Sequence, residues 1–213
     1  MLWRLPFINK LLSHMNNPSY LEIGFGGGEV FESVNSNDKK CCDPGPWDNV
    51  AVKFHKNKDC ILLSSDDFFT QNKKKIDFIF IDGHHEYDYV RRDFFNAMNV
   101  LNDGGYVMLH DCNPPNEWRC RPISQFINGE AWNGDGGYRL LMELYTTTTE
   151  YNWVTSHEDE GCCLVWKGER TPVSLPAQDW KTFDSNRDDI LNLMPMSEIL
   201  QIIATDNNDT MNS

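Results

Sequence analysis

Five short and mostly apolar runs divide the first half of the chain. They lie at 20–23, 40–42, 61–63, 76–81 and 106–109. The run at 76–81 is nearly all apolar, which is typical of a strand buried on both faces of a parallel sheet. Helical stretches are expected between several of these runs. This repetition of strand, loop and helix predicts a parallel sheet with helices on both faces.

The helices are predicted from apolar spacing and from residues that start or stop them. Residues 86–101 place their apolar side chains at helical spacing, and 102–105, with Asn, Asp and two glycines, predict the end of that helix. Two further helices are expected at 29–34 and 137–145. Another helix is expected to begin near Ser65, which suits an N-cap.

The second half of the chain predicts a hairpin that closes the sheet. The runs 152–155 and 162–166 flank a polar turn, as two antiparallel strands do. The expected fold is therefore α/β, Rossmann-like and doubly wound. Its mostly parallel sheet would have seven strands, with the antiparallel hairpin at its C-terminal end.

The length of 213 residues suits one domain with flanking segments. We expect an N-terminal cap segment at 1–17, where a helical apolar stripe packs on the domain. The domain itself is expected at 18–168. A polar C-terminal extension is expected at 169–213, with a frayed tail from residue 206.

The charge balance excludes some partners. Lys plus Arg is 19 and Asp plus Glu is 32, giving a net charge of −13. A chain this acidic repels phosphate backbones and anionic lipids, so we expect neither nucleic acid nor a membrane as a partner.

The seven cysteines are an odd number without CxxC spacing, and no secretory signal is recognisable. We therefore expect reduced thiols and a cytoplasmic location. The oligomeric state is not predicted.

A glycine-rich loop follows the first predicted strand. Its glycines let the backbone bend sharply and approach a ligand closely, although a tight turn alone would also explain them. The loop lacks the Lys-Ser/Thr of a nucleotide P-loop. Asp43 follows Gly24 by 43 − 24 = 19 residues, the offset at which an acid can hold a ribose hydroxyl. The combination predicts a nucleoside ligand.

The same loop resembles motif I of class I S-adenosylmethionine-dependent methyltransferases, E/D-x-G-x-G-x-G. The matching run is Leu21-Glu22-Ile23-Gly24-Phe25-Gly26-Gly27. Two later blocks, 78–87 and 101–111, resemble the F-I-D-G-x-H motif and the L-x-x-G-G-x-x-x-x-H-D strand of one branch, of the methyltransferase domain 24 type. The resemblance covers 18–167 and implies methyl transfer from S-adenosylmethionine.

The resemblance also implies which residues hold the cofactor. The glycine loop would contact its methionine and ribose parts, Asp43 the ribose hydroxyls and Asp66 the adenine amino group. The full expected set is Glu22, Gly24, Phe25, Gly26, Gly27, Asp43, Ser65, Asp66 and Asp82.

Acids and histidines follow two strands that should be neighbours. Asp82 ends the run 76–81, His85 lies three residues further on, and His110 and Asp111 end the next strand. The carboxyl ends of parallel strands share one edge, where open α/β sheets bind ligands. We therefore expect Asp82, His85, His110 and Asp111 to be catalytic.

Two mechanisms remain open for this cluster. Asp82 and Asp111 could hold a divalent metal such as Mg²⁺, which would lower the pKa of an acceptor hydroxyl. Magnesium-binding relatives in this branch carry another acid beside the second aspartate, whereas this chain has Cys112. Without a metal, His85 or His110 would be the general base, because a histidine pKa lies near neutral pH. Each histidine could equally be structural.

The acceptor is not specified by the sequence. Segments 113–118 and 132–135 combine aromatic, amide and acidic residues, which suits a polar ring such as a sugar, although ordinary loop packing explains them equally well. The favoured function is O-methylation of a small molecule or glycan. The alternatives are a non-catalytic nucleoside-binding or S-adenosylmethionine-binding protein and an NAD-dependent oxidoreductase. An NAD-dependent oxidoreductase would require a complete G-x-G-x-x-G loop and a separate catalytic domain.

Overall fold

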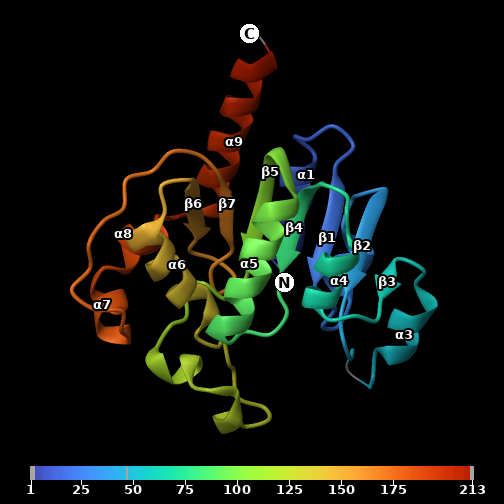
Figure 1. Cartoon of the computed structure of the whole chain (residues 1–213), viewed down its shortest axis with the longest axis horizontal. Helices are drawn as coiled ribbons and strands as arrows, with labels where there is room; N and C mark the ends of the chain where they lie inside the picture. The colour runs from blue at the N-terminus through green and yellow to red at the C-terminus, as the bar shows by residue number, and fades with distance from the viewer. Residues whose placement is uncertain (1–2, 47, 212–213) are drawn as a thin grey trace.

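The computed structural model describes residues 3–46 and 48–211. Its centre is an eight-stranded sheet in the order β3-β2-β1-β4-β5-β7-β6-β8 (Figure 1). The strands are β1 (Ser19–Ile23), β2 (Asp38–Cys42), β3 (Cys60–Ile61), β4 (Ile76–Ile81), β5 (Leu101–Leu109), β6 (Tyr151–Ser156), β7 (Cys163–Lys167) and β8 (Leu193–Met194). Strands β1 to β5 are parallel, whereas β7 is antiparallel to both β5 and β6. The predicted α/β fold with a closing antiparallel hairpin is confirmed.

Helices cover both faces of the sheet and build two apolar cores. One core contains side chains of α4 (Ser65–Gln71), α5 (Tyr87–Val100), α6 (Gly136–Thr147), α7 (Trp180–Ser185) and α8 (Arg187–Leu191). The other contains side chains of α1 (Arg4–Leu12), α2 (Glu29–Ser33), α3 (Ala51–Lys56) and α9 (Met196–Met211). In Figure 1, α4, α5 and α6 lie in front of the sheet. Strands buried between two helical layers explain the apolar run of β4.

The N-terminal stripe forms helix α1, which packs against α2 and α9. Its apolar residues Phe7, Ile8, Leu11 and Leu12 are all buried, so the segment covers the domain as a cap. Pro6 lies in the first turn of α1, where a missing backbone N–H costs little. Among the described residues, no helix is both long enough and apolar enough to cross a membrane.

The C-terminal extension adds an eighth strand, so the predicted count of seven was wrong. The two-residue strand β8 pairs in parallel with β6 at Thr155 and Ser156. A strand this short has no periodicity that the sequence could reveal. The frayed tail predicted from residue 206 is helical through Met211 as part of α9, and residues 212–213 lie outside the described part.

Two element boundaries also differ from the prediction. Ser64, not Ser65, is the N-cap of α4, since its hydroxyl accepts a hydrogen bond from the backbone N–H of Asp67 at 3.1 Å. Residues 102–105 do not form a loop after α5 but continue in β5, with an irregular register opposite β4. Gly104 takes a left-handed φ of 76° there, which allows the irregularity.

Candidate active site

A cavity of about 680 Å³ opens at the carboxyl edge of the sheet. The ends of β1, β2, β4 and β5 form its floor, and residues from α1, α4 and α5 contribute to its walls. Carboxyl groups dominate its ionisable lining, and they belong to Glu22, Glu29, Asp43, Asp66, Asp82, Asp93 and Asp111. The basic residues that line it are fewer, namely Arg4, Arg92, His84, His85 and His110. The cavity therefore favours a ligand that carries positive charge.

The glycine loop after β1 is tied to the end of β2 by Asp43. One carboxylate oxygen of Asp43 accepts a hydrogen bond from the backbone N–H of Phe25 at 2.9 Å, and the other accepts from the N–H of Gly45 at 2.8 Å. Asp43 lies at the carboxyl edge of the sheet, as predicted. It shapes two loops of the cavity in addition to facing its interior.

Two glycines of this loop serve different purposes. Gly24 has a φ of 90°, and a Cβ there would collide with the backbone of Asp82, so the close packing of β1 on β4 requires glycine. Gly26 has a φ of 50°, and a Cβ there would meet no described atom within 4 Å. Because Gly26 lines the cavity, its open side is free for a ligand to approach the backbone.

The predicted residues Ser65 and Asp66 line the far end of the cavity, at the start of α4. The carboxylate of Asp66 pairs with Arg92 at 3.3 Å. Ser65 contacts Asp93, a buried acid of α5 that the sequence did not single out. Burial raises the pKa of Asp93 to about 6. This end of the cavity thus presents several polar groups that can recognise a ligand.

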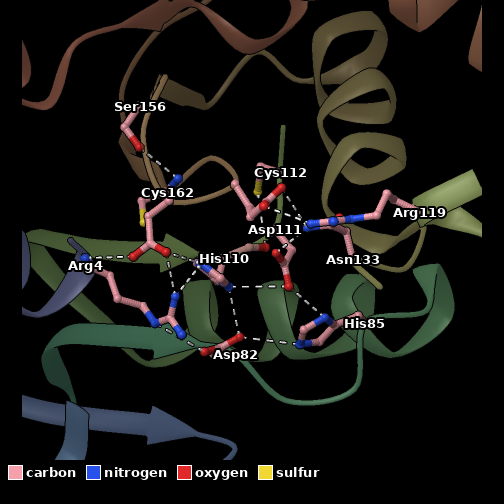
Figure 2. A network of polar contacts seen from close by, with 12 residues as sticks. Arg4, Asp82, His85, His110, Asp111, Cys112, Arg119, Asn133, Ser156 and Cys162 are labelled. Atoms are coloured by element: carbon pink, nitrogen blue, oxygen red, sulfur yellow. Dashed lines mark hydrogen bonds and ion pairs between the residues drawn. The ribbon is translucent and has the colours of Figure 1, made fainter. Parts of the chain in front are cut away.

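Asp82, His85, His110 and Asp111 meet at one point, as the strand order predicted (Figure 2). Nδ1 of His85 lies 2.9 Å from Oδ2 of Asp111, and its Nε2 lies 3.4 Å from Oδ1 of Asp82. Nδ1 of His110 lies 3.2 Å from Asp82 and 3.4 Å from Asp111. Neither Nδ1 has a partner in hydrogen-bonding geometry, so the attraction is ionic.

The charges of this cluster stabilise one another. Burial raises the pKa of Asp82, but His110 and His85 outweigh it and hold that pKa well below its ordinary value. The pKa of Asp111 is lowered for the same reason. Burial lowers the pKa of His85, yet Asp111 and Asp82 raise it to about 9. At neutral pH both carboxylates are therefore ionised and His85 is a cation.

Arg4 and Asp159 complete the cluster, and the sequence analysis missed both. Asp159 accepts hydrogen bonds from the backbone N–H and from Nη1 of Arg4, each at 2.8 Å. Nη1 of Arg4 also lies 2.9 Å from Nε2 of His110. Burial lowers the pKa of His110, but Asp82 and Asp111 raise it well above its ordinary value. The carboxylates of Asp82, Asp111 and Asp159 thus surround His110 and favour its charged form.

Glu22 is buried behind the cluster at 3% exposure. It accepts a hydrogen bond from the hydroxyl of Tyr20 at 2.6 Å. Burial raises the pKa of Glu22 to about 8, so this carboxyl is mostly neutral at pH 7. The acid of the motif is therefore an uncharged part of the cavity floor.

Comparisons with known proteins agree with this geometry. Residues 21–112, from β1 to the end of β5, match the family described as "Methyltransferase domain". Residues 21–112 therefore carry a methyltransferase domain, and its fold is that of the class I, S-adenosylmethionine-dependent methyltransferases. No curated protein sequence matches the chain.

Solved structures share the fold of this methyltransferase domain at low identity. An O-methyltransferase from Bacillus cereus, solved with SAH, is 15% identical with a TM-score of 0.53 over 79% of this chain and 82% of that one. PaMTH1 from Podospora anserina, also SAH-bound, is 15% identical with a TM-score of 0.52 over 79% and 80%. MycE, solved with Mg, SAH and mycinamycin VI, is 15% identical with a TM-score of 0.50 over 82% and 52%.

The cavity of the methyltransferase domain fits its cofactor. The sulfonium and amino groups of S-adenosylmethionine are cationic, which suits the carboxylate-rich lining. The open side of Gly26 leaves room beside the loop. The residues predicted to hold the cofactor, from Glu22 to Asp82, all line this one cavity.

The predicted acceptor segment lies beside the cluster. The ring of Trp132 stacks on His85 with centroids 5.5 Å apart and planes 7° from parallel, and Tyr89 packs on His84 at 4.1 Å. Residues 122–131 are all exposed. Asn133 belongs to a segment that suited either an acceptor site or ordinary loop packing, and it is buried behind Asp111. Cys112 is buried with a raised pKa, as expected of a thiol that is not a nucleophile.

Proposed function

We propose that this chain methylates a hydroxyl oxygen of a small-molecule or glycan acceptor. The observation that carries the proposal is the convergence of Asp82, His85, His110 and Asp111 beside the glycine loop, in one cavity. S-adenosylmethionine supplies an electrophilic methyl group when it is bound. The protein must then hold the acceptor oxygen in line with that methyl group and provide for loss of the hydroxyl proton.

Asp82 and Asp111 are proposed to hold a divalent cation, Mg²⁺. Ligand atoms of Asp82, His85 and Asp111 lie within 4.8 Å of one another. Carboxylate oxygens are the ligands that suit Mg²⁺, and Asp82 and Asp111 supply them from the ends of two neighbouring strands. A metal here would lower the pKa of an acceptor hydroxyl. The presence of Mg in the structure of MycE supports the proposal.

The protonation state of His85 favours activation of the acceptor by a metal over a mechanism with a histidine as general base. His85 has a pKa of about 9 because Asp111 and Asp82 stabilise its cation. A histidine that already carries its proton at pH 7 cannot accept another one. In the absence of metal, His85 and Arg4 supply the positive charge that the two carboxylates require.

The acceptor is proposed to be a ring without negative charge. Trp132, Tyr89 and His84 offer flat faces beside the reacting centre, on which a sugar or aromatic ring can stack. The carboxylates of the cavity disfavour an anionic group near the reacting hydroxyl.

The test is a screen of hydroxylated rings, glycosides and catechols, with release of S-adenosylhomocysteine as the readout. Turnover should need a divalent metal and should disappear in Asp82→Asn. A protein that binds S-adenosylhomocysteine but methylates none of the acceptor classes would support the non-catalytic alternative.

A further inference from the structure

The buried side chain of Asn133 lies between Arg119 and Asp111 of the catalytic cluster. It is 1% exposed, and its Nδ2 lies 2.6 Å from Oδ1 of Asp111. On its other side, Nε of Arg119 donates to Oδ1 of Asn133 at 2.7 Å. Figure 2 shows Asn133 between these two residues. A buried amide with both ends engaged has a fixed orientation.

The direction of each hydrogen bond follows from the donors. A guanidinium can only donate, so the atom that Arg119 contacts must be the amide oxygen of Asn133. The amide nitrogen then faces Asp111 and must donate to it. Glu160 supports this arrangement, because it accepts from Nη2 of Arg119 at 2.8 Å and faces Nδ2 of Asn133 at 3.4 Å.

The backbone around Asn133 is equally fixed. Its N–H donates to the carbonyl of Arg119 at 2.9 Å, and the N–H of Gly136 donates to the carbonyl of His85 at 2.9 Å. A Cβ at Gly134 would collide with the backbone of His85, and a Cβ at Gly137 would collide with that of Asp111. The segment that carries Asn133 therefore packs closely against the backbones of both His85 and Asp111.

We propose that Asn133 is the positioning residue for Asp111. By holding Oδ1 of Asp111, it turns Oδ2 toward Nδ1 of His85 at 2.9 Å and toward Nδ1 of His110 at 3.4 Å. Asp111 itself has a left-handed φ of 58°, a strained conformation for a residue other than glycine that persists only where the surrounding structure fixes it. The role of this orientation in catalysis rests on the proposed function.

The test uses an isosteric change and its reversal. Asn133→Asp keeps an oxygen that accepts from Arg119. It replaces the amide group that donates to Asp111 with a carboxylate oxygen, so two carboxylates face each other there. The new carboxylate also faces Glu160. The melting temperature of this variant should fall by about 4–8 °C. The double variant Asp111→Asn with Asn133→Asp restores a donor and an acceptor in reversed order. With Asp111→Asn measured separately, the double variant should therefore be more stable than the sum of the two single losses predicts. Asn128→Asp makes the same charge change at an exposed position of the same loop and should shift the melting temperature by about 2 °C or less.

Nuclear magnetic resonance of the wild-type protein supplies an independent readout. A side-chain amide proton of Asn133 should appear downfield of other asparagine amides and exchange slowly. The ring ¹⁵N signals of His85 should move in Asn133→Asp and stay in place in Asn128→Asp. Additive losses in the double variant, or unmoved His85 signals, would overturn the proposal. S-adenosylhomocysteine binding, measured on the wild type, tests the proposed function separately.

Discussion

The carboxylate of Asp43 holds the backbone N–H of Phe25 at 2.9 Å, and this contact joins the glycine loop after β1 to the end of β2. The second oxygen of Asp43 holds the N–H of Gly45 at 2.8 Å. One acid therefore shapes two walls of the cavity. The spacing of 19 residues from Gly24, which suggested a ribose contact, also fits this structural link.

Asp43→Ala should weaken S-adenosylhomocysteine binding about 10–100-fold, because a charged hydrogen bond contributes about 1.5–3 kcal/mol. Its melting temperature should also fall, since the N–H groups of Phe25 and Gly45 lose their partner. Isothermal titration calorimetry and thermal unfolding measure the two effects. Asp48→Ala removes an exposed acid nearby and is the control. Equal affinity in both variants would remove Asp43 from the binding site.

Gly26→Leu should abolish S-adenosylhomocysteine binding while the domain still folds, because the new side chain would project into open cavity space. Gly104→Leu is its control, since Gly104 also has a positive φ and open space but lies outside the cavity. Circular dichroism checks the fold, and calorimetry checks binding. Normal binding by the Gly26 variant would show that the ligand lies elsewhere.

Gly24→Ala should destabilise the protein whether or not a ligand is present, since its Cβ would collide with the backbone of Asp82. A loss of several kcal/mol is expected, because backbone cannot move aside cheaply and the φ of 90° is strained for alanine. Urea unfolding without ligand measures the loss. An unchanged midpoint would contradict the close packing of β1 on β4.

Glu22 should make stability fall as pH rises from about 4.5 to about 8. Its folded pKa is raised to about 8, so the folded protein keeps a proton that the unfolded chain releases above about 4.5. The stabilisation is fully present below that lower value and is lost as pH passes through the folded pKa. Glu22→Gln should remove a slope of up to about 1.4 kcal/mol per pH unit.

The measurement for Glu22 is urea unfolding of both proteins at several pH values between 4.5 and 8.5. Other titrating groups are common to both and cancel in the difference. Parallel stability curves would show that Glu22 titrates normally. Tyr20 should keep its hydrogen bond in the variant, because the glutamine oxygen still accepts from its hydroxyl.

A divalent metal should stabilise the wild-type protein through Asp82 and Asp111. At a concentration 100 times its Kd, Mn²⁺ or Mg²⁺ should add about 2.7 kcal/mol, or roughly 5–10 °C in melting temperature. Asp82→Asn should lose this shift. Asp103→Asn should keep it, because the Asp103 carboxylate is exposed at another edge of the sheet. Equal shifts in all three proteins would contradict the metal site.

Much of the site followed from the sequence because strand ends in a parallel sheet converge. Asp82 and Asp111 end β4 and β5, which are direct neighbours, so their meeting was predictable from two apolar runs. Arg4 was not predictable, since it arrives from helix α1, 155 residues from Asp159 in sequence. Only tertiary packing brings these two residues together, and no local pattern in the sequence marks such a pair.

The fold was predictable where elements are long and strongly patterned. Strand β4 and helix α5 lie within one residue of the expected bounds. Strand β8 has two residues in a polar region, and it exists because β6 offers a free edge to Leu193 and Met194. Asn133 was noted in the sequence for its polar, aromatic surroundings. Its place behind Asp111 depends on how the loop after β5 folds back, which local sequence does not specify.

The most direct test of the central claim is calorimetric titration of the wild-type protein with S-adenosylmethionine, S-adenosylhomocysteine and NAD. We expect one site per chain for the first two ligands, lost in Gly26→Leu, and no binding of NAD. Binding of NAD without S-adenosylmethionine or S-adenosylhomocysteine would contradict this claim.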